Sequence, residues 1–105
     1  MHAVMRYTVR ADQLQSHLDL LRDVYDDLAD TRPSGIAWTT YQVTGTRTFV
    51  EFVEGPELPE PLPQLESFQR YRVGLDDRCE GDREFLELQQ VGTFRRLCDG
   101  ESTER

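Results

Sequence analysis

The chain contains no lysine and no asparagine, so all 12 of its basic side chains are arginines. Without lysine no lysine Schiff base can form, and without asparagine no such amide can orient a substrate oxygen. Two cysteines are too few for a disulfide framework, so we expect Cys79 and Cys98 to be reduced thiols. Together with His2 and His17 they lack the spacing of a zinc site, and no bound metal is expected.

Long apolar runs and an excess of positive charge are also missing. No run approaches the ~20 apolar residues of a membrane span, and the first residues lack the pattern of a signal peptide, which favours a cytoplasmic location. Acidic residues outnumber basic ones by 20 to 12, for a net charge of -8. Such a charge repels nucleic acid, and no basic amphipathic segment favours a membrane surface. Neither partner is therefore expected.

Sequence motifs for a catalytic serine, for nucleotide cofactors and for a catalytic zinc are likewise missing. The chain has no G-x-S-x-G, phosphate loop, dinucleotide fingerprint or H-E-x-x-H, so no cofactor is expected. A length of 105 residues corresponds to one domain. We expect residues 1–97 to form that domain and residues 98–105 to form a polar C-terminal tail.

The first half of the chain shows one strand and one helix. Alternating apolar residues predict a strand over 3–9, with the face of Ala3, Met5, Tyr7 and Val9 toward helices. A helix is predicted over 12–30, with Asp12 and Gln15 at capping-box spacing. Its apolar stripe consists of Leu14, His17, Leu18, Leu21, Val24, Tyr25 and Leu28.

The second half predicts three strands and a second helix. Strands over 36–43 and 46–53 are joined at Thr44 and Gly45, a length typical of a tight hairpin. Residues 54–63 hold four of the five prolines and predict an extended loop. A second helix is predicted over 65–79, ended by Gly81 and Asp82, before a strand over 85–91 that 93–97 could extend.

This β-α-β-β-α-β order predicts an α+β fold, the ferredoxin-like sandwich, in which a four-stranded antiparallel sheet carries two helices on one face. Aromatic and apolar residues occupy both faces of the central hairpin, so the second face of the sheet also needs cover. The sheet of a second copy is the simplest cover, and we expect a homodimer that associates through its sheet faces.

Several segments together resemble the antibiotic biosynthesis monooxygenase-like members of the dimeric α/β-barrel superfamily. They are "VMRYTV", "LRDVYDDL", "RPSGIAWTTYQV", "TFVEFVE", "PLPQLESFQRYRVGLDDRC" and "VGTFR", which span about residues 3–96. The resemblance implies a dimer with a pocket in each subunit between helices and sheet. Some relatives oxidise phenolic or quinol-type substrates with dioxygen and neither metal nor flavin, whereas others degrade haem.

The chain departs from relatives of this kind at three places. The haem-degrading branch uses an asparagine with a tryptophan and a histidine, and this chain has Trp38 but no asparagine. In many relatives a histidine follows a phenylalanine by three places in the second helix, where this chain has Phe68 and Tyr71. Glu51 stands where close relatives often have histidine. A haem-degrading role is therefore not expected.

Candidate site residues lie on both expected helices and on the hairpin. His17 is either a hydrogen-bonded core residue or the base that takes a phenolic proton from a substrate. Trp38 either stacks on an aromatic substrate or fills the core. Tyr41 points to the opposite sheet face by strand alternation and is expected at the subunit interface.

Three tyrosines could converge between the first strand and the two helices: Tyr7, Tyr25 and Tyr71. They indicate a polar-lined cavity, or else hydroxyls that reach the surface. Arg72 could bind a substrate oxyanion or pair with a carboxylate at the edge of the fold, and Glu51 has the same two readings. Phe68 would add an apolar wall.

Two functions follow as hypotheses. The first is a cofactor-independent monooxygenase-like enzyme acting on a small aromatic or phenolic molecule, with His17 and Tyr71 as catalytic residues. Trp38, Arg72, Tyr7, Tyr25 and Phe68 would then bind the substrate. The second is a non-catalytic small-molecule-binding or regulatory dimer, and a lesser alternative is an isomerase or cyclase that uses the same pocket.

Overall fold

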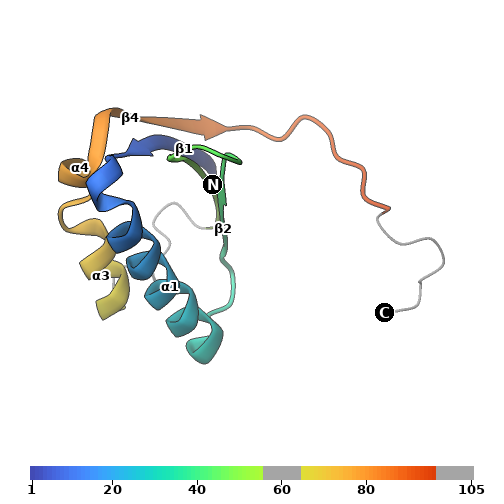
Figure 1. Ribbon diagram of the computed structural model, residues 1–105. Helices are drawn as coiled ribbons and strands as arrows, with labels where there is room; N and C mark the ends of the chain where they lie inside the picture. The colour runs from blue at the N-terminus through green and yellow to red at the C-terminus, as the bar shows by residue number, and fades with distance from the viewer. Residues whose placement is uncertain (56–64, 97–105) are drawn as a thin grey trace.

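The computed structural model describes residues 1–55 and 65–96 of the chain. A four-stranded antiparallel sheet has the order β2-β3-β1-β4, formed by β1 (His2–Val9), β2 (Ala37–Gln42), β3 (Thr48–Glu54) and β4 (Cys79–Leu88). Helices α1 (Leu14–Thr31) and α3 (Glu66–Arg72) lie together on one side of this sheet (Figure 1). The ferredoxin-like sandwich predicted from the element order is thereby confirmed.

Helix α1 presents its apolar stripe to the sheet, as predicted. His17, Leu21 and Val24 are its buried residues. The predicted capping box is wrong, because a short 3-10 helix (Ala11–Gln13) precedes the α-helix and Gln15 bonds the Asp19 carboxylate at 3.0 Å instead. The helix ends where Arg32 adopts a left-handed conformation, and its backbone N–H donates to the carbonyl of Leu28.

The predicted second helix over 65–79 is interrupted. Helix α3 stops at Arg72, and a single turn, α4 (Leu75–Arg78), follows after Gly74, whose φ is 75°. Glycine takes this left-handed conformation without steric cost. The break frees backbone carbonyls, and the Arg78 guanidinium donates to those of Tyr71, at 2.6 Å, and Val73, at 3.1 Å.

Strand β4 begins at Cys79, well before the predicted start at residue 85. Gly81 and Asp82, read from the sequence as helix breakers, lie inside this strand. Gly81 has a φ of 73°, and the pairing with β1 shifts register between Arg6 and Thr8. The glycine therefore marks a β-bulge and not a helix end.

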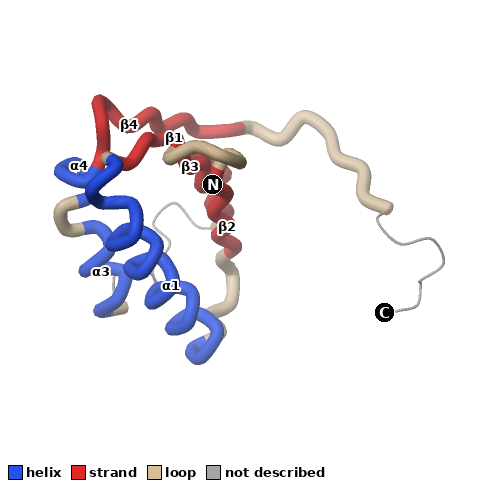
Figure 2. Tube along the Cα trace, in the orientation of Figure 1, coloured by secondary structure: helices blue, strands red, loops and turns tan. Residues whose placement is uncertain are grey.

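The chain after Leu88 does not continue the strand, contrary to the expectation for 85–91 and for the described part of 93–97. Residues 89–96 form an extended segment that leaves the sheet and runs away from the helices (Figures 1 and 2). Leu97 and the predicted tail lie outside the described residues. Of the proline-rich loop predicted over 54–63, only residues 54 and 55 are described.

The β2–β3 connection is longer than the predicted two-residue turn. Residues 43–47 join the strands, Gly45 has a φ of 77°, and the Thr46 hydroxyl donates to the Val43 carbonyl at 2.8 Å. The two strands still pair over six residues, from Ala37 with Glu54 to Gln42 with Phe49. Both faces of the hairpin therefore alternate as the sequence predicted.

The main core lies between the helices and the sheet. Its buried members include Tyr7, Val9 and Phe49 from the sheet and Leu21, Phe68 and Tyr71 from the helices. On the opposite sheet face Tyr41 is 58% exposed, Phe52 43% and Leu86 50%. The core of the helix face is therefore covered within one chain, although Phe85 of β4 on that face is 61% exposed. The other face leaves several large apolar side chains in solvent.

No helix in the described part of the chain is long and apolar enough to cross a membrane. Among residues 1–55 and 65–96 there is also no group of three or more histidine, cysteine or acidic side chains that could hold a metal ion. Cys79 is a buried free thiol, and Cys98 lies outside the described residues.

Candidate functional site

A pocket of about 250 Å³ opens on the helix side of the sheet. Its apolar wall comes from both layers and consists of Met1, Ala3, Val4, Met5, Val53, Phe68 and Phe85. Five residues with polar atoms also line it: Trp38, Glu51, Tyr71, Arg72 and Arg83. An apolar cavity with a few convergent polar groups is the usual form of a small-molecule site.

Among the described residues that line this pocket, Glu51 is the only carboxylate. Strand alternation on β3 points it inward, between Phe49 and Val53, and it is only 4% exposed. Its Oε2 atom accepts hydrogen bonds from the hydroxyls of Tyr7, at 2.6 Å, and Tyr71. Burial raises the pKa of the Glu51 carboxyl, although the hydrogen bonds from Tyr7, Tyr71 and the Trp38 side chain partly oppose that rise.

The two phenols beside Glu51 stay protonated at any physiological pH. Burial is the largest cause that raises the pKa of Tyr7 and of Tyr71, and the nearby Glu51 charge adds to it. The two hydroxyl oxygens lie 3.0 Å apart. Both hydroxyls are therefore fixed donors toward the carboxylate, and neither is a proton acceptor for a substrate.

His17 lies behind this cluster and is fully buried. Its Nε2 atom is 2.8 Å from the Tyr7 hydroxyl oxygen, and its Nδ1 atom accepts from Nε of Arg78 at 3.2 Å. Burial first, and the Arg78 charge second, lower the pKa of His17 to about 4. The ring is therefore neutral at pH 7.

Only one tautomer of His17 satisfies all of these bonds. Because Nδ1 accepts from Arg78, the ring proton is on Nε2 and is donated to the Tyr7 oxygen. Tyr7 then has its own proton available for Glu51. The bonds run in one direction, from Arg78 through His17 and Tyr7 to the carboxylate at the pocket wall.

The structure brings together most of the residues predicted for the site. Trp38, Phe68, Tyr71 and Arg72 line the pocket. The Trp38 ring meets Phe68 and Tyr71 edge-on, at centroid distances of 5.7 and 5.8 Å. Arg72 is exposed at the end of α3, and its Cζ atom lies 5.8 Å from the centre of the Phe68 ring.

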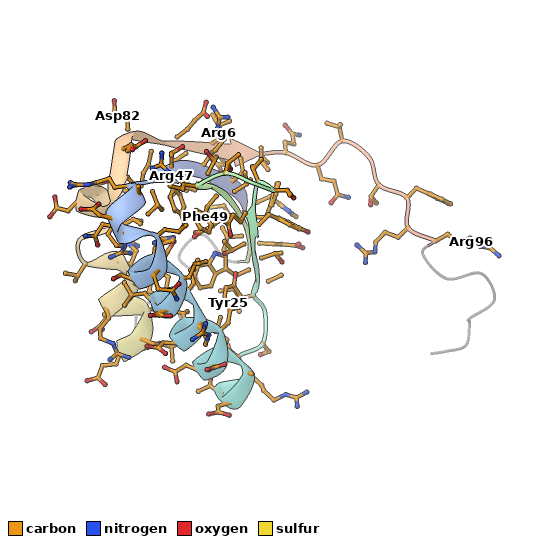
Figure 3. The ribbon with its side chains drawn as sticks, viewed as in Figure 1. Arg6, Tyr25, Arg47, Phe49, Asp82 and Arg96 are labelled. Atoms are coloured by element: carbon orange, nitrogen blue, oxygen red, sulfur yellow. The ribbon has the colours of Figure 1, made fainter. Side chains whose placement is uncertain are left out.

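Three other predicted residues lie outside the pocket wall. His17 and Tyr7 do not line the pocket. They are connected to it by hydrogen bonds, from His17 to Tyr7 and from Tyr7 to Glu51. Tyr25, on α1, points toward the sheet (Figure 3). Its ring stacks on Trp38 at 5.0 Å between ring centres, and its hydroxyl lies 2.7 Å from that of Thr40. The convergence expected of three tyrosines is thus a convergence of Tyr7 and Tyr71.

Sequence reasoning weighed Glu51 without selecting it, and it did not identify Arg78 or Arg83. The signal for Glu51 is an acidic residue at an inward position, two residues from both Phe49 and Val53 on a strand. Arg78 had no such signal, because its partners His17 and Tyr71 come together only in the fold.

The fold is shared with several solved structures. An antibiotic biosynthesis monooxygenase superposes with a TM-score of 0.68 at 15% identity, over 87% of this chain and 98% of its own. A candidate antibiotic biosynthesis monooxygenase from Nitrosomonas europaea gives 0.67 at 12%, over 86% and 88%. Another from Bacteroides thetaiotaomicron gives 0.72 at 11%, over 93% and 95%.

These comparisons confirm, at the level of the fold, the resemblance seen in the sequence. No protein-family model matches the chain, and no curated protein matches it in sequence. At identities of 11 to 15% a shared fold does not transfer a reaction. Function therefore has to be argued from the pocket itself.

Proposed function

We propose that the chain is a monooxygenase-like enzyme that acts without a cofactor on a small aromatic or phenolic molecule. One observation supports this most strongly. A nearly buried carboxyl, that of Glu51, lies at the wall of an apolar pocket with a raised pKa and three side chains that donate to it. A carboxyl whose pKa is moved toward neutrality by burial is suited to exchange a proton with a bound substrate.

The proposed reaction begins with proton loss from the substrate to Glu51. The resulting phenolate or carbanion is electron-rich and reacts with dioxygen at a ring carbon. That carbon loses its remaining hydrogen and forms a C=O bond to one oxygen atom, and the second oxygen leaves as water with that hydrogen and the proton held by Glu51. The four electrons that reduce dioxygen come from the substrate, so no external reductant is consumed.

The role of His17 changes in this proposal. The sequence suggested it as the proton acceptor, but its Nε2 atom faces Tyr7 and the ring does not line the pocket. A ring whose pKa is about 4 is also a weak base at pH 7. We assign His17 and Arg78 to the positioning of Tyr7, and through Tyr7 of Glu51. Tyr71 contacts both Glu51 and the pocket, as expected of a catalytic residue.

The pocket also limits the size of the substrate. A volume of about 250 Å³ lies below the roughly 300 to 1,000 Å³ of typical ligand sites, which favours a molecule of one or two rings. Trp38 and Phe68 meet edge-on and provide two aromatic walls for such a ring.

A homodimer is part of the proposal. Tyr41, Phe52 and Leu86 leave apolar surface exposed on the sheet face away from the helices. A second sheet would cover it. Light scattering at micromolar concentration should give twice the chain mass, and Phe52→Asp should shift the protein toward a monomer. A monomer for the unaltered chain would contradict this part of the proposal.

The alternative is a non-catalytic small-molecule-binding or regulatory dimer. It is favoured by the complete hydrogen bonding of Glu51 within the chain, because a carboxyl with three donors needs no substrate to satisfy it. This alternative predicts a bound aromatic ligand and no product. The lesser alternative, an isomerase or cyclase, predicts product without oxygen uptake.

One pair of measurements separates these functions. Trp38 is the only tryptophan and lines the pocket, so its fluorescence reports binding of small phenols and quinols. Oxygen uptake with each compound that binds then reports turnover. Glu51→Gln should keep binding but slow uptake at least ~100-fold, the scale of general-base catalysis. Glu87→Gln, on exposed β4, is the control that should leave both unchanged. Equal uptake by the two variants would refute the role of Glu51.

A further inference from the structure

The polar groups of the pocket are of two kinds. Glu51, Tyr71 and Trp38 are linked through the hydrogen bonds around the Glu51 carboxyl. Arg72 and Arg83 also line the pocket, but from more exposed positions on α3 and β4. Two guanidinium groups are therefore added to a cavity whose remaining wall is mainly apolar.

This arrangement is unusual for the composition of the chain. Acidic residues outnumber basic ones by 20 to 12, yet the described residues that line the pocket include two arginines and one carboxylate. The pocket therefore presents cationic side chains in a molecule whose net charge is negative.

The two arginines differ in their partners. Arg72 lies over the Phe68 ring at 5.8 Å, and no carboxylate of the described residues is within ion-pair distance of its guanidinium. Nε of Arg83 donates to Asp76 at 2.6 Å, and its Nη1 lies 3.3 Å from the Met5 sulfur. Arg83 also acts on Glu51 through its charge.

We propose that the natural ligand of this pocket is an aromatic acid, whose carboxylate binds Arg72 while its phenol or enol reaches Glu51. The proposal rests on the proposed function and specifies its substrate class. An anion at Arg72 gains charge-assisted hydrogen bonds from a planar donor group. The same anion beside Glu51 would meet a second carboxyl in a poorly solvated site. The carboxylate end of the ligand is therefore expected at the exposed Arg72, and the phenol or enol end at the buried Glu51.

A matched pair of ligands tests the proposal. The acid is 4-hydroxyphenylacetate, and the neutral partner of nearly the same shape is 4-hydroxyphenylacetamide. Quenching of Trp38 fluorescence measures the affinity of each for the full chain. The acid should bind about tenfold more tightly than the amide, a ratio worth one charge-assisted contact. Raising salt from ~0.05 to ~0.5 M should weaken binding of the acid and not of the amide.

Variants of two arginines on the same helix assign the effect. Arg72→Gln keeps most of the side-chain length and should abolish the preference for the acid, because it should weaken binding of the acid much more than binding of the amide. Arg70→Gln is the control, because Arg70 is paired with Glu66 at 3.9 Å on α3 and does not line the pocket. It should retain the preference.

The possible failures are distinguishable. Equal binding of acid and amide, or the same preference in Arg72→Gln and Arg70→Gln, would overturn the aromatic-acid proposal while leaving a neutral phenol as substrate. If neither ligand, nor any phenol or quinol tried alongside them, quenches Trp38, the proposed function fails together with it.

Discussion

The two faces of the sheet differ in how their side chains are satisfied. On the helix face, Tyr7 and Glu51 are buried and hydrogen-bonded to each other and to groups of α1 and α3. On the other face, Tyr41 and Phe52 meet edge-on at 6.0 Å and stay exposed. The polar groups of the helix face are thus hydrogen-bonded within one chain, whereas the second face leaves aromatic side chains in solvent.

Strand β3 allows the sharpest test, because Phe49 and Phe52 lie on its opposite faces. Phe49 is 1% exposed and packs between Tyr7 and His17, at 5.6 and 4.8 Å between ring centres. Phe49→Ala should therefore lower the free energy of unfolding by about 3 to 5 kcal/mol. Chemical denaturation measures the loss.

Phe52→Ala is the matched control for that prediction. Its side chain is 43% exposed, so the same truncation should cost the single chain much less, about 1 kcal/mol. A loss in Phe52→Ala as large as in Phe49→Ala, measured at concentrations where the protein is monomeric, would contradict the difference between the faces.

Arg78 is the next largest expected effect on the helix face. Arg78→Met leaves the His17 Nδ1 atom and the carbonyls of Tyr71 and Val73 without their donor. Buried acceptors without partners destabilise, and we expect a loss of about 2 to 4 kcal/mol in unfolding free energy. Arg83→Met, which removes a solvent-accessible ion pair with Asp76, should cost about 1 kcal/mol or less. If Arg78→Met lost no more unfolding free energy than Arg83→Met, the hydrogen bonds of Arg78 would contribute little to stability.

His17 predicts a dependence of stability on pH. Its pKa is about 4 in the folded chain against 6.5 for an ordinary histidine, so the unfolded chain binds a proton first as pH falls. The stability contributed by neutral His17 is present above pH 6.5 and is lost as pH falls toward 4, by about 2 to 3 kcal/mol.

The variant His17→Gln isolates this dependence. Glutamine does not titrate, so urea denaturation at a series of pH values should show a smaller loss between pH 6.5 and 4 than in the unaltered chain. Glu51 acts in the opposite direction, because its raised pKa lowers stability as pH rises through it, and it is the same in both proteins. Parallel curves for the two proteins would contradict the lowered pKa of His17.

Replacement of Tyr25 should have the smallest effect on stability, and it tests whether Tyr25 lies outside the ligand pocket. Tyr25→Phe removes one hydroxyl bonded to Thr40, behind Trp38, and should cost about 1 kcal/mol in stability. Ligand affinity measured through Trp38 should stay unchanged. Tyr71→Phe, which removes a hydroxyl from Glu51, should instead alter the pH dependence of binding.

Much of the fold could be predicted because alternation and helical periodicity are local. The inward face of β1 and the buried stripe of α1 follow directly from the residue pattern. The break between α3 and α4 could not be predicted, because the Arg78 side chain that satisfies its carbonyls acts across the turn. Gly81 was misread because a glycine in a bulge and one at a helix end look alike in sequence.

The sequence predicted which residues lie near the pocket better than it predicted the role of each residue. Tyr71 and Trp38 reach the pocket as their patterns suggested. The exchange of roles between His17 and Glu51 could not be seen, because the donors to Glu51 come from β1, β2 and α3, which are far apart along the chain. Only their joint placement supports the proposed roles, with Glu51 as the proton acceptor and His17 as a positioning residue.

The protonation of Glu51 tests this account most directly. The carboxyl can be followed by infrared difference spectroscopy or by carbon-13 NMR over a pH series, with Glu51→Gln identifying its signal. We predict a buried carboxyl that titrates above the ordinary glutamate value of 4.5, and whose titration moves when Tyr7 or Tyr71 is replaced by phenylalanine. A carboxylate fully ionised at pH 5, and indifferent to both replacements, would contradict the assignment of Glu51 as the proton acceptor of the pocket.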